Sequence, residues 1–225
     1  MKLQLVALLP FKRHSERVPN KNFRHLCGRP LYSWILETLL SIREIDLVVI
    51  NTDAGGSLSD TGLATNPRVL IRDRNPELCG DLVSMNSIIE DDTKAVCSNT
   101  YLMTHTTNPL LSAATIRAAL SSYENGMKSK LHDSLFTVNR IQTRFYRADG
   151  SAANHNPAQL LRTQDLEPWY EENSNLYIFS AESFRRTGAR IGAKPLLFET
   201  LRKESMDIDD QDGWDIAEAV AKARS

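Results

Sequence analysis

The chain has 225 residues, of which 41% are hydrophobic and 24% charged, and its 27 basic and 28 acidic residues leave a net charge of −1. These proportions are typical of an ordinary globular protein with enough apolar material for a sizeable core. The near-neutral charge argues against a nucleic-acid partner, because such proteins concentrate Lys and Arg.

Two features indicate a cytoplasmic protein without a membrane partner. The three cysteines, Cys27, Cys79 and Cys97, are odd in number and form no CxxC pair, as expected of reduced thiols. The first apolar run, residues 3–9, is too short for a membrane span, and no signal-peptide cleavage pattern follows it.

Strands and helices are predicted to alternate through the first 134 residues. Short apolar runs indicate strands, and longer segments with apolar residues on one face indicate helices. In chain order the predictions are strand 3–9, helix 30–40 with Pro at its first turn, strands 47–50 and 69–71, helix 84–90, strand 101–104, and helix 113–123 with Ser112 as N-cap. Short apolar strands separated by helices predict an α/β fold, with a mostly parallel, Rossmann-like sheet flanked by helices.

The alternation breaks after about residue 134. The remaining predictions are strands at 135–138 and 176–179, helices at 181–186 and 214–223, and hairpins and loops around 143–147 and up to Pro168. We therefore divide the chain into an α/β domain, residues 1–134 and 173–225, and a small β-rich excursion, residues 135–172.

The loop after the first strand, residues 10–22, is rich in cations and short hydrogen-bonding side chains. Ligands of open α/β sheets bind at the carboxyl ends of the strands, where this loop emerges. Neither GxGxxG nor GxxxxGK[ST] occurs, so Lys and Arg side chains and loop amides would have to hold a phosphate group. This composition favours a polyphosphate ligand; the alternative is a solvated basic surface.

Two carboxylates in Asp207-Ile208-Asp209 form a second candidate site. In an extended segment, residues i and i+2 point to the same side, so both carboxylates would face one ligand. Two hard oxygen ligands beside a triphosphate suit Mg²⁺. The alternative is an acidic helix start, in which Asp209, Asp210 and Asp212 cap the last helix; the two roles are compatible.

Six short motifs follow one another along nearly the whole chain. They are Pro10…Lys12…Ser15-Glu16-Arg17-Val18-Pro19…Lys21-Asn22 with Gly28-Arg29-Pro30-Leu31, then Asn51-Thr52-Asp53, Arg74-Asn75-Pro76-Glu77-Leu78, Thr106-Thr107-Asn108-Pro109-Leu110, Arg162-Thr163-Gln164-Asp165-Leu166 with Tyr170-Glu171-Glu172-Asn173, and Asp207-Ile208-Asp209 with Asp212. In this order they resemble the motifs of the cytidylyltransferases that activate acidic sugars, the CMP-sialic acid (acylneuraminate) and CMP-Kdo synthetases. The resemblance implies a nucleotidyltransferase fold of the GT-A-like kind and an Mg²⁺-dependent transfer of CMP from CTP to a small acidic acceptor, with release of pyrophosphate.

The resemblance also implies roles for residues of the nucleotide site. Lys21 and Arg17 would hold the phosphates, and Lys12 would stabilise charge on the α-phosphoryl oxygens. The nucleotide-binding residues would be Ser15, Asn22, Arg74 and Ser84, and the metal ligands would be Asp207 and Asp209. Arg74 could instead form a surface salt bridge, and Ser84 could be the N-cap of the helix that follows it. The family usually has Arg at the position of Lys12, and Glu16 lowers the positive charge of the loop.

Acceptor binding is implied for His105, Arg162, Gln164, Asn173 and Tyr177, with an Arg holding the acceptor carboxylate. His105 stands where the family usually has Gln, which leaves the identity of the acceptor open. Tyr177 alternates with apolar neighbours and could equally be a core residue.

The excursion is predicted to form a homodimer interface. It carries Phe136, Phe145, Tyr146, Leu160, Leu161 and Trp169, which lack the periodicity that would bury them on the chain's own sheet. The resemblance implies the same assembly; the alternative is a lid over the chain's own site.

Other functions remain open at this point. They are a cytidylyltransferase for a non-sugar acid such as a phosphonate, a metal-dependent glycosyltransferase, and a non-catalytic nucleotide-binding module. A glycosyltransferase would normally carry its acidic pair after the central strand, where residues 101–109 have none. Lys21, Asp207 and Asp209 argue against a non-catalytic module.

Overall fold

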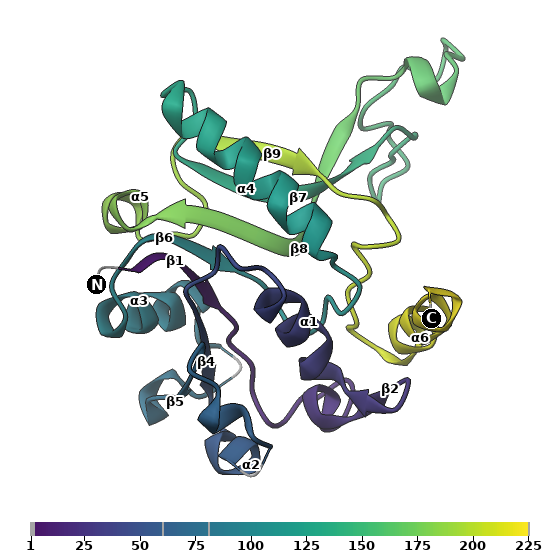
Figure 1. Cartoon of the computed structure of the whole chain (residues 1–225). Helices are drawn as coiled ribbons and strands as arrows, with labels where there is room; N and C mark the ends of the chain where they lie inside the picture. Colours follow the sequence, from purple (N-terminus) through teal and green to yellow (C-terminus); the bar gives the residue numbers. More distant parts are fainter. Residues whose placement is uncertain (1–2, 60, 81, 225) are drawn as a thin grey trace.

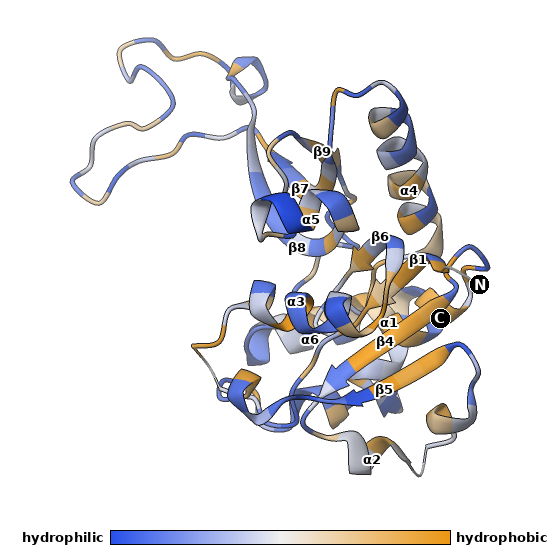
Figure 2. Ribbon diagram, turned by 90° about the vertical axis from the view of Figure 1, so that its left-hand side faces the viewer, coloured by the Kyte–Doolittle hydropathy of each residue, from blue (hydrophilic) through white to orange (hydrophobic). Residues whose placement is uncertain are grey.

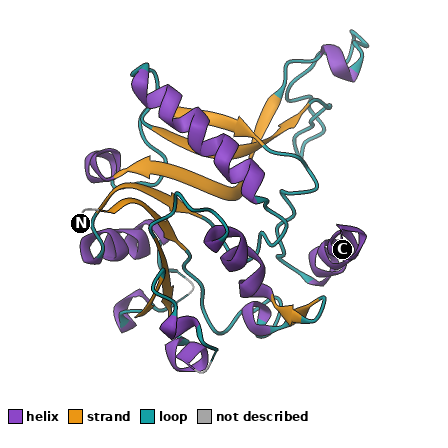
Figure 3. Ribbon diagram, viewed as in Figure 1, coloured by secondary structure: helices purple, strands orange, loops and turns teal. Residues whose placement is uncertain are grey.

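The computed structural model describes residues 3–59, 61–80 and 82–224, which form an α/β fold around a seven-stranded sheet (Figures 1 and 3). In spatial order the strands are β5 (Val69–Asp73), β4 (Leu47–Thr52), β1 (Leu3–Leu8), β6 (Ser98–Met103), β8 (Trp169–Ser180), β7 (Ser134–Ile141) and β9 (Pro195–Glu199). Strand β8 pairs antiparallel with β6 and β7, whereas the other neighbouring strands pair in parallel. The mostly parallel sheet predicted from the sequence is confirmed.

Helices cover both faces of this sheet, because successive side chains of a strand point to opposite faces. On one face α1 (Leu31–Leu40) and α4 (Ala113–Lys128) pack against Leu5, Ala7 and Ile50. On the other face α3 (Met85–Ala95) and α5 (Ala181–Thr187) pack against Val6 and Leu8. Figure 2 shows that β4 and β5 are hydrophobic over much of their length.

A smaller core fixes the C-terminal helix α6 (Gln211–Arg224). Trp214 of this helix and Ile208 before it are buried against Val18 and Leu31. The hairpin of β2 (His25–Leu26) and β3 (Arg29–Pro30) adds Leu26 to the same core. Its turn, Cys27-Gly28, has positive φ at both residues, which a glycine adopts without strain. This packing brings the segment before α6 next to the loop that follows β1.

The predicted elements are present, most of them with longer bounds; α2 (Gly55–Ser59), the β2–β3 hairpin, β9 and the 3₁₀ turns were not predicted. Helix α1 begins at Leu31, with Pro30 as its N-cap instead of its first turn. Ser112 caps α4 as predicted, accepting from the Thr115 amide at 3.2 Å. Helix α2 is short and starts with two glycines, so its sequence has low helix propensity. Strand β9 starts with a proline and is only partly buried, as an edge strand can be.

The part of the chain that leaves the sheet is smaller than the predicted excursion of residues 135–172. Residues 138–141 pair with residues 169–172, so both ends of the excursion extend β7 and β8 of the main sheet. The remainder, residues 142–168, we call the outer loop; its regular structure is the turn Thr163–Asp165 and an isolated bridge between Tyr146 and Ala152. Figures 1 and 2 show the outer loop projecting away from the sheet.

Parallel strands bring the segments that follow them to one edge of the sheet. The loop after β1, the segment after β4 and the segment after β6 all emerge at the carboxyl edge.

Over the described part of the chain, no helix combines the length and the apolar character needed to cross a membrane.

Candidate functional site

The basic loop after β1 ends in a short 3₁₀ turn, Lys21–Phe23, that fixes two of its polar residues. Asn20 begins this turn in the left-handed conformation (φ 52°), which Asn adopts more readily than most residues. Lys21 and Asn22 are 8% and 4% exposed. Since buried polar side chains need partners, their contacts show how the site is built.

Lys21 joins the basic loop to the acidic segment before α6. Its Nζ donates to the carbonyl oxygen of Ile208 at 2.5 Å and lies 3.9 Å from Oδ1 of Asp209. Burial lowers the pKa of Lys21, and the neighbouring carboxylates of Asp209 and Asp207 oppose that shift. A lysine and the predicted acidic pair therefore meet in one place, although they lie at opposite ends of the sequence.

Asn22 joins the same loop to the segment after β6. Its Nδ2 donates to the carbonyl oxygen of Lys12, and its Oδ1 accepts from the Thr106 hydroxyl, both at 2.6 Å. Both ends of this amide are therefore used inside the chain. Asn22 therefore stabilises the conformation of the loop after β1. Its direct contact with a nucleotide stays a prediction.

The predicted phosphate-binding residues surround a hollow of about 220 Å³. It is lined by Lys12, Ser15, Glu16, Arg17, Val18 and Lys21. Arg17 is largely exposed and donates to Asp209 Oδ1 at 3.0 Å. The three cations predicted to bind phosphate thus lie around one space, whose size suits a small anionic group.

The segment 207–209 carries one buried and one half-exposed carboxylate, those of Asp207 and Asp209. Ile208 between them is fully buried, and its amide donates to the Thr107 carbonyl oxygen at 3.0 Å. Oδ1 of Asp207 is buried without a hydrogen-bond partner among the described residues. Burial, and secondarily Asp209, raise the pKa of Asp207, while a hydrogen bond with Thr107 opposes them.

This donor set fits a hard divalent cation. A buried carboxylate oxygen without a partner, beside a second carboxylate, is the arrangement such an ion would neutralise. Within residues 3–59, 61–80 and 82–224, no group of three His, Cys, Asp or Glu residues could hold a metal. Asp207 and Asp209 are the residues here that could hold such an ion.

The carboxylate of Asp210 caps α6. Oδ1 of Asp210 accepts from the Gly213 amide at 2.8 Å, which caps the helix. Asp212 lies inside the first turn of α6 rather than before it. The acidic run is thus divided: Asp210 caps, and Asp207 and Asp209 face the basic loop.

Arg74 and Ser84, predicted to lie near the nucleotide, both have structural partners. Arg74 donates to Oδ1 and the carbonyl oxygen of Asn51 at 2.8 Å and to the Phe11 carbonyl oxygen at 3.2 Å. Burial lowers the pKa of Arg74. It therefore ties the end of β4 to the loop after β1 instead of forming a surface salt bridge. Ser84 caps α3, accepting from the Asn86 amide at 3.2 Å.

His105 and Tyr177 lie together, with an arginine that the sequence did not single out. The Arg190 guanidinium stacks on the Tyr177 ring at 3.8 Å and donates to its hydroxyl at 2.9 Å, and Nη1 lies 3.5 Å from Nε2 of His105. Arg190 follows α5 in an irregular segment, where no periodicity or motif marks it. Burial, with the charges of Arg190 and Lys21, lowers the pKa of His105 to about 3.

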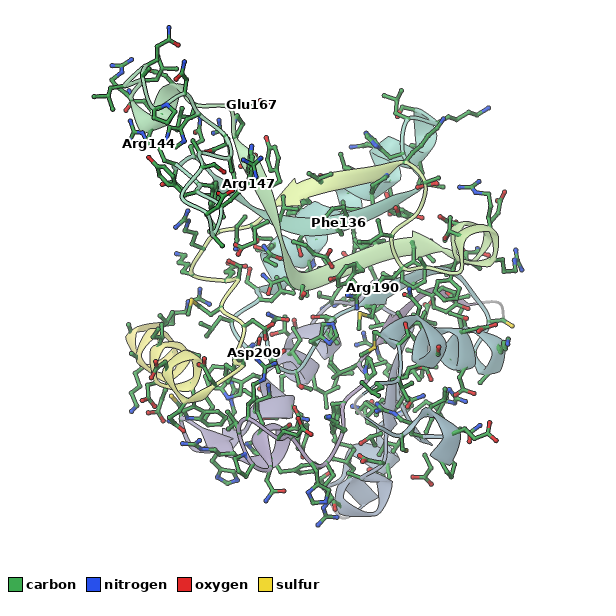
Figure 4. All side chains as sticks on the ribbon, turned by 180° about the vertical axis from the view of Figure 1, so that it is seen from behind. Phe136, Arg144, Arg147, Glu167, Arg190 and Asp209 are labelled. Atoms are coloured by element: carbon green, nitrogen blue, oxygen red, sulfur yellow. The ribbon has the colours of Figure 1, made fainter. Side chains whose placement is uncertain are left out.

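The other predicted acceptor residues do not join this cluster within one chain. Arg162 and Gln164 are exposed in the outer loop, and Arg162 pairs with Asp165 at 2.7 Å. Asn173 is buried and donates to Asn139 Oδ1 and to the Thr200 hydroxyl, so it joins strands of the sheet. Figure 4 shows the outer loop, with Arg144 and Arg147, well apart from both Asp209 and Arg190.

Comparison with known sequences gives one consistent result. A sequence model of the family described as "Cytidylyltransferase" matches residues 6–216. N-acylneuraminate cytidylyltransferases of Oncorhynchus mykiss and Streptococcus agalactiae are 26% and 22% identical over 96% and 93% of this chain, which spans about half of their length (50% and 51%). The CMP-N,N′-diacetyllegionaminic acid synthase of Legionella pneumophila is 25% identical over 97% of this chain and 96% of its own.

Solved structures show the same fold at low sequence identity. The CMP:2-keto-3-deoxy-manno-octonic acid synthetase complexed with CTP has a TM-score of 0.69 at 12% identity, covering 99% of this chain and 100% of that one. The 4-diphosphocytidyl-2C-methyl-D-erythritol synthase of Anaerococcus prevotii also has a TM-score of 0.69 at 12% identity, covering 99% and 97%. The predicted nucleotidyltransferase fold is confirmed.

Proposed function

The chain belongs to the cytidylyltransferase family, and from that premise we propose that it transfers CMP from CTP to an acidic sugar and releases pyrophosphate. The acceptor class is a 2-keto sugar acid, since the sequence relatives named above are N-acylneuraminate cytidylyltransferases and a CMP-N,N′-diacetyllegionaminic acid synthase. The resemblance seen in the motifs supports the same class.

One observation carries this proposal. Lys21 bridges the basic loop and the acidic pair, so cations and carboxylates meet at the carboxyl edge of a nucleotide-binding sheet. Cations alone would suit any anion. A paired set of Lys, Arg and Asp suits a metal-bound triphosphate, whose oxygens need both kinds of partner.

The cationic residues hold and neutralise the triphosphate. Lys21 and Arg17 bind the phosphates that leave as pyrophosphate, and Lys12 stabilises the charge that builds on the α-phosphoryl oxygens. Transfer needs little covalent help, because positioning and charge neutralisation supply most of the barrier reduction. An acceptor hydroxyl forms the new bond to the α-phosphorus as the bond to the β-phosphate oxygen breaks, and the hydroxyl proton is released.

Asp207 and Asp209 would hold Mg²⁺. When bound, the ion supplies positive charge to the phosphate oxygens and to the leaving pyrophosphate. The orphaned Oδ1 of Asp207 supports this assignment, because a buried carboxylate oxygen without a partner is costly unless a cation meets it.

Ser15, Asn22, Arg74 and Ser84 position the nucleotide in this proposal. Ser15 lines the same hollow as the three cations, which supports a direct contact with the nucleotide. Asn22 and Arg74 act by shaping the loop after β1, since their polar atoms bind within the chain. Ser84 acts through the start of α3, which it caps.

We further propose a homodimer in which the outer loop contacts the partner chain. Tyr146 and Leu160 of this loop are 58% and 87% exposed, and Phe145 of the loop stacks on Trp169 at the start of β8, which is 42% exposed. Exposed aromatic and aliphatic clusters are typical of association surfaces. Light scattering at micromolar concentration tests this, and a mass near that of one 25.3-kDa chain contradicts it.

The direct test of the function is pyrophosphate release. Each of the four nucleoside triphosphates is incubated with Mg²⁺ and N-acetylneuraminic acid, N,N′-diacetyllegionaminic acid or 2-keto-3-deoxy-manno-octonic acid. Pyrophosphate with CTP and one of these acids is expected. Release only with a phosphonate acceptor would favour the non-sugar alternative, and CTP binding without release would favour a binding module. The Asp209→Ala variant is the matched control.

A further inference from the structure

Arg190 lies half-buried beside the site, at a position that no motif assigns. Its backbone amide donates to Asn86 Oδ1 at 3.3 Å, which fixes the segment after α5 against α3. Figure 4 places Arg190 beneath β8, on the inner side of that strand. The side chain is 19% exposed, so its guanidinium is held in place yet reaches solvent.

The guanidinium has more donors than its neighbours satisfy. Among the described residues, its hydrogen bonds go to the Tyr177 hydroxyl at 2.9 Å, to His105 Nε2 at 3.5 Å and to the sulfur of Met103 at 3.8 Å. The last two are weak by distance or by the acceptor. Glu172 lies 3.6 Å away, within ion-pair range. The five N–H donors of the Arg190 guanidinium thus have one good oxygen acceptor among the described residues, the Tyr177 hydroxyl.

The surroundings favour an anion at this place. His105 lies within the influence of both Lys21 and Arg190, and burial keeps its imidazole neutral, because its pKa falls to about 3. A neutral imidazole adds no charge of its own and can hydrogen-bond. Lys21 is one of the proposed phosphate-binding residues and Arg190 lies 3.5 Å from His105, so His105 links the cluster around Arg190 to the phosphate side of the site.

We propose that Arg190 binds the carboxylate of the acceptor and, together with His105, makes the site select acidic acceptors. The planar guanidinium offers a carboxylate two parallel N–H donors while its face remains stacked on Tyr177. Glu172 pairs loosely with Arg190 in the absence of the acceptor and is the group that the carboxylate would displace. This inference rests on the proposed function and assigns the acceptor contact within one chain.

The test compares free acids with their methyl esters. Wild-type protein is assayed for pyrophosphate release with N-acetylneuraminic acid, N,N′-diacetyllegionaminic acid and 2-keto-3-deoxy-manno-octonic acid, and the best substrate is then used as acid and as ester. Arg190→Gln should raise the KM for the acid about 10- to 100-fold, as loss of a charge-assisted hydrogen-bond pair predicts. The KM for CTP should change less than threefold, and the preference for acid over ester should disappear.

Arg185→Gln is the matched control, because Arg185 is exposed on α5 and its loss changes the net charge equally. It should behave as wild type. An unchanged acceptor KM in Arg190→Gln, with wild-type activity present, overturns the inference and leaves the proposed function standing. No release by the wild-type protein with any of these acids contradicts the proposed function instead.

A second variant covers the case in which Arg190→Gln does not fold. Glu172→Gln removes the carboxylate that competes for Arg190, and the side chain of Glu172 is 41% exposed, so folding should tolerate the change. We expect the KM for the acid to fall two- to fivefold, with that for the ester unchanged. An equal or higher KM for the acid would contradict the role of Arg190.

Discussion

The two sides of the candidate site are held in different ways. On the phosphate side, residues 10–22 and 207–209, Lys21 is buried and bound to the Ile208 carbonyl oxygen, and Asn22 spans the Lys12 carbonyl oxygen and Thr106. On the acceptor side, Arg162 lies exposed in the outer loop and binds a neighbour three residues away. Buried contacts between distant segments fix the first arrangement, whereas a local surface ion pair contributes little to fixing the second.

This difference teaches which part of the proposed reaction one chain can organise alone. The phosphate side needs no other molecule to bring its cations and carboxylates together. The acceptor side has one fixed part, Arg190 with His105 and Tyr177, and one part that projects away from it. Completion of the second part by another chain is therefore the feature to test, and the variants below do so from the largest expected effect to the smallest.

The largest effect is expected from Asp209→Ala. Asp209 is half-exposed and pairs with Arg17 and Lys21, so its loss should leave the fold intact and remove one of the two carboxylates proposed to hold Mg²⁺. We expect pyrophosphate release to fall at least about 100-fold at millimolar Mg²⁺, a loss of ~3 kcal/mol in transition-state stabilisation. A loss below tenfold with the same Mg²⁺ dependence would show that this carboxylate has only an ion-pairing role.

Lys21→Ala should weaken CTP binding strongly. The variant removes the buried ammonium that reaches both the basic loop and the acidic pair. Calorimetric titration with CTP should show a Kd raised roughly 30- to 100-fold, equivalent to ~2–3 kcal/mol for a charge-assisted contact. Lys21→Arg should not restore binding, because the guanidinium is too large for a site that is 8% exposed.

Lys12→Ala should mainly lower the turnover number, about tenfold, because the charge on the α-phosphoryl oxygens grows in the transition state. The KM for CTP should change little. Lys12→Arg should retain at least half of the wild-type activity, since it restores the residue usual in the family. Normal turnover by Lys12→Ala would contradict the assignment of this lysine to the α-phosphate.

Mixing two inactive variants tests whether the acceptor side is shared. If Arg162 from one chain serves the site of its partner, Arg162→Ala mixed with Asp209→Ala should recover roughly a quarter of wild-type activity, because half of the dimers are mixed and each has one intact site. Each variant incubated alone is the control. An absence of recovery, with mixed dimers detected by mass, would confine each site to one chain.

The smallest effect is a gain in stability from Asp207→Asn. The buried Oδ1 of Asp207 lacks a partner among the described residues, and burial raises the pKa of this carboxyl. Removing the charge should raise the Tm of the metal-free protein by about 2–4 °C at neutral pH, as expected for ~1 kcal/mol in a chain of this size. The same variant should lose activity. A lower Tm would show that the charge of Asp207 stabilises the fold.

Much of the fold could be predicted from local patterns. Apolar runs gave β1, β4 and β6, and the serine before α4 gave its start. Strand β9 lacked such a pattern, because an edge strand is buried on fewer sides and tolerates proline and polar residues. The outer ends of β7 and β8 lacked such a pattern as well: residues 138–141 and 169–172 are mostly polar or exposed, and they pair with each other, with Val138 also opposite Glu199 of β9.

The candidate site also has features that local patterns predicted and features that they did not. The sequence by itself determined the i, i+2 carboxylates, the cations of the first loop and the resemblance to the cytidylyltransferases, because these depend on residue type and spacing alone. Only the tertiary structure decided that Lys21 meets Ile208, 187 residues away, and that Arg190 meets His105, 85 residues away. It also decided that Asn22 and Arg74 bind backbone rather than stand free. The physical reason is that such contacts depend on the order of strands and on what is buried between them, neither of which is written in any local pattern.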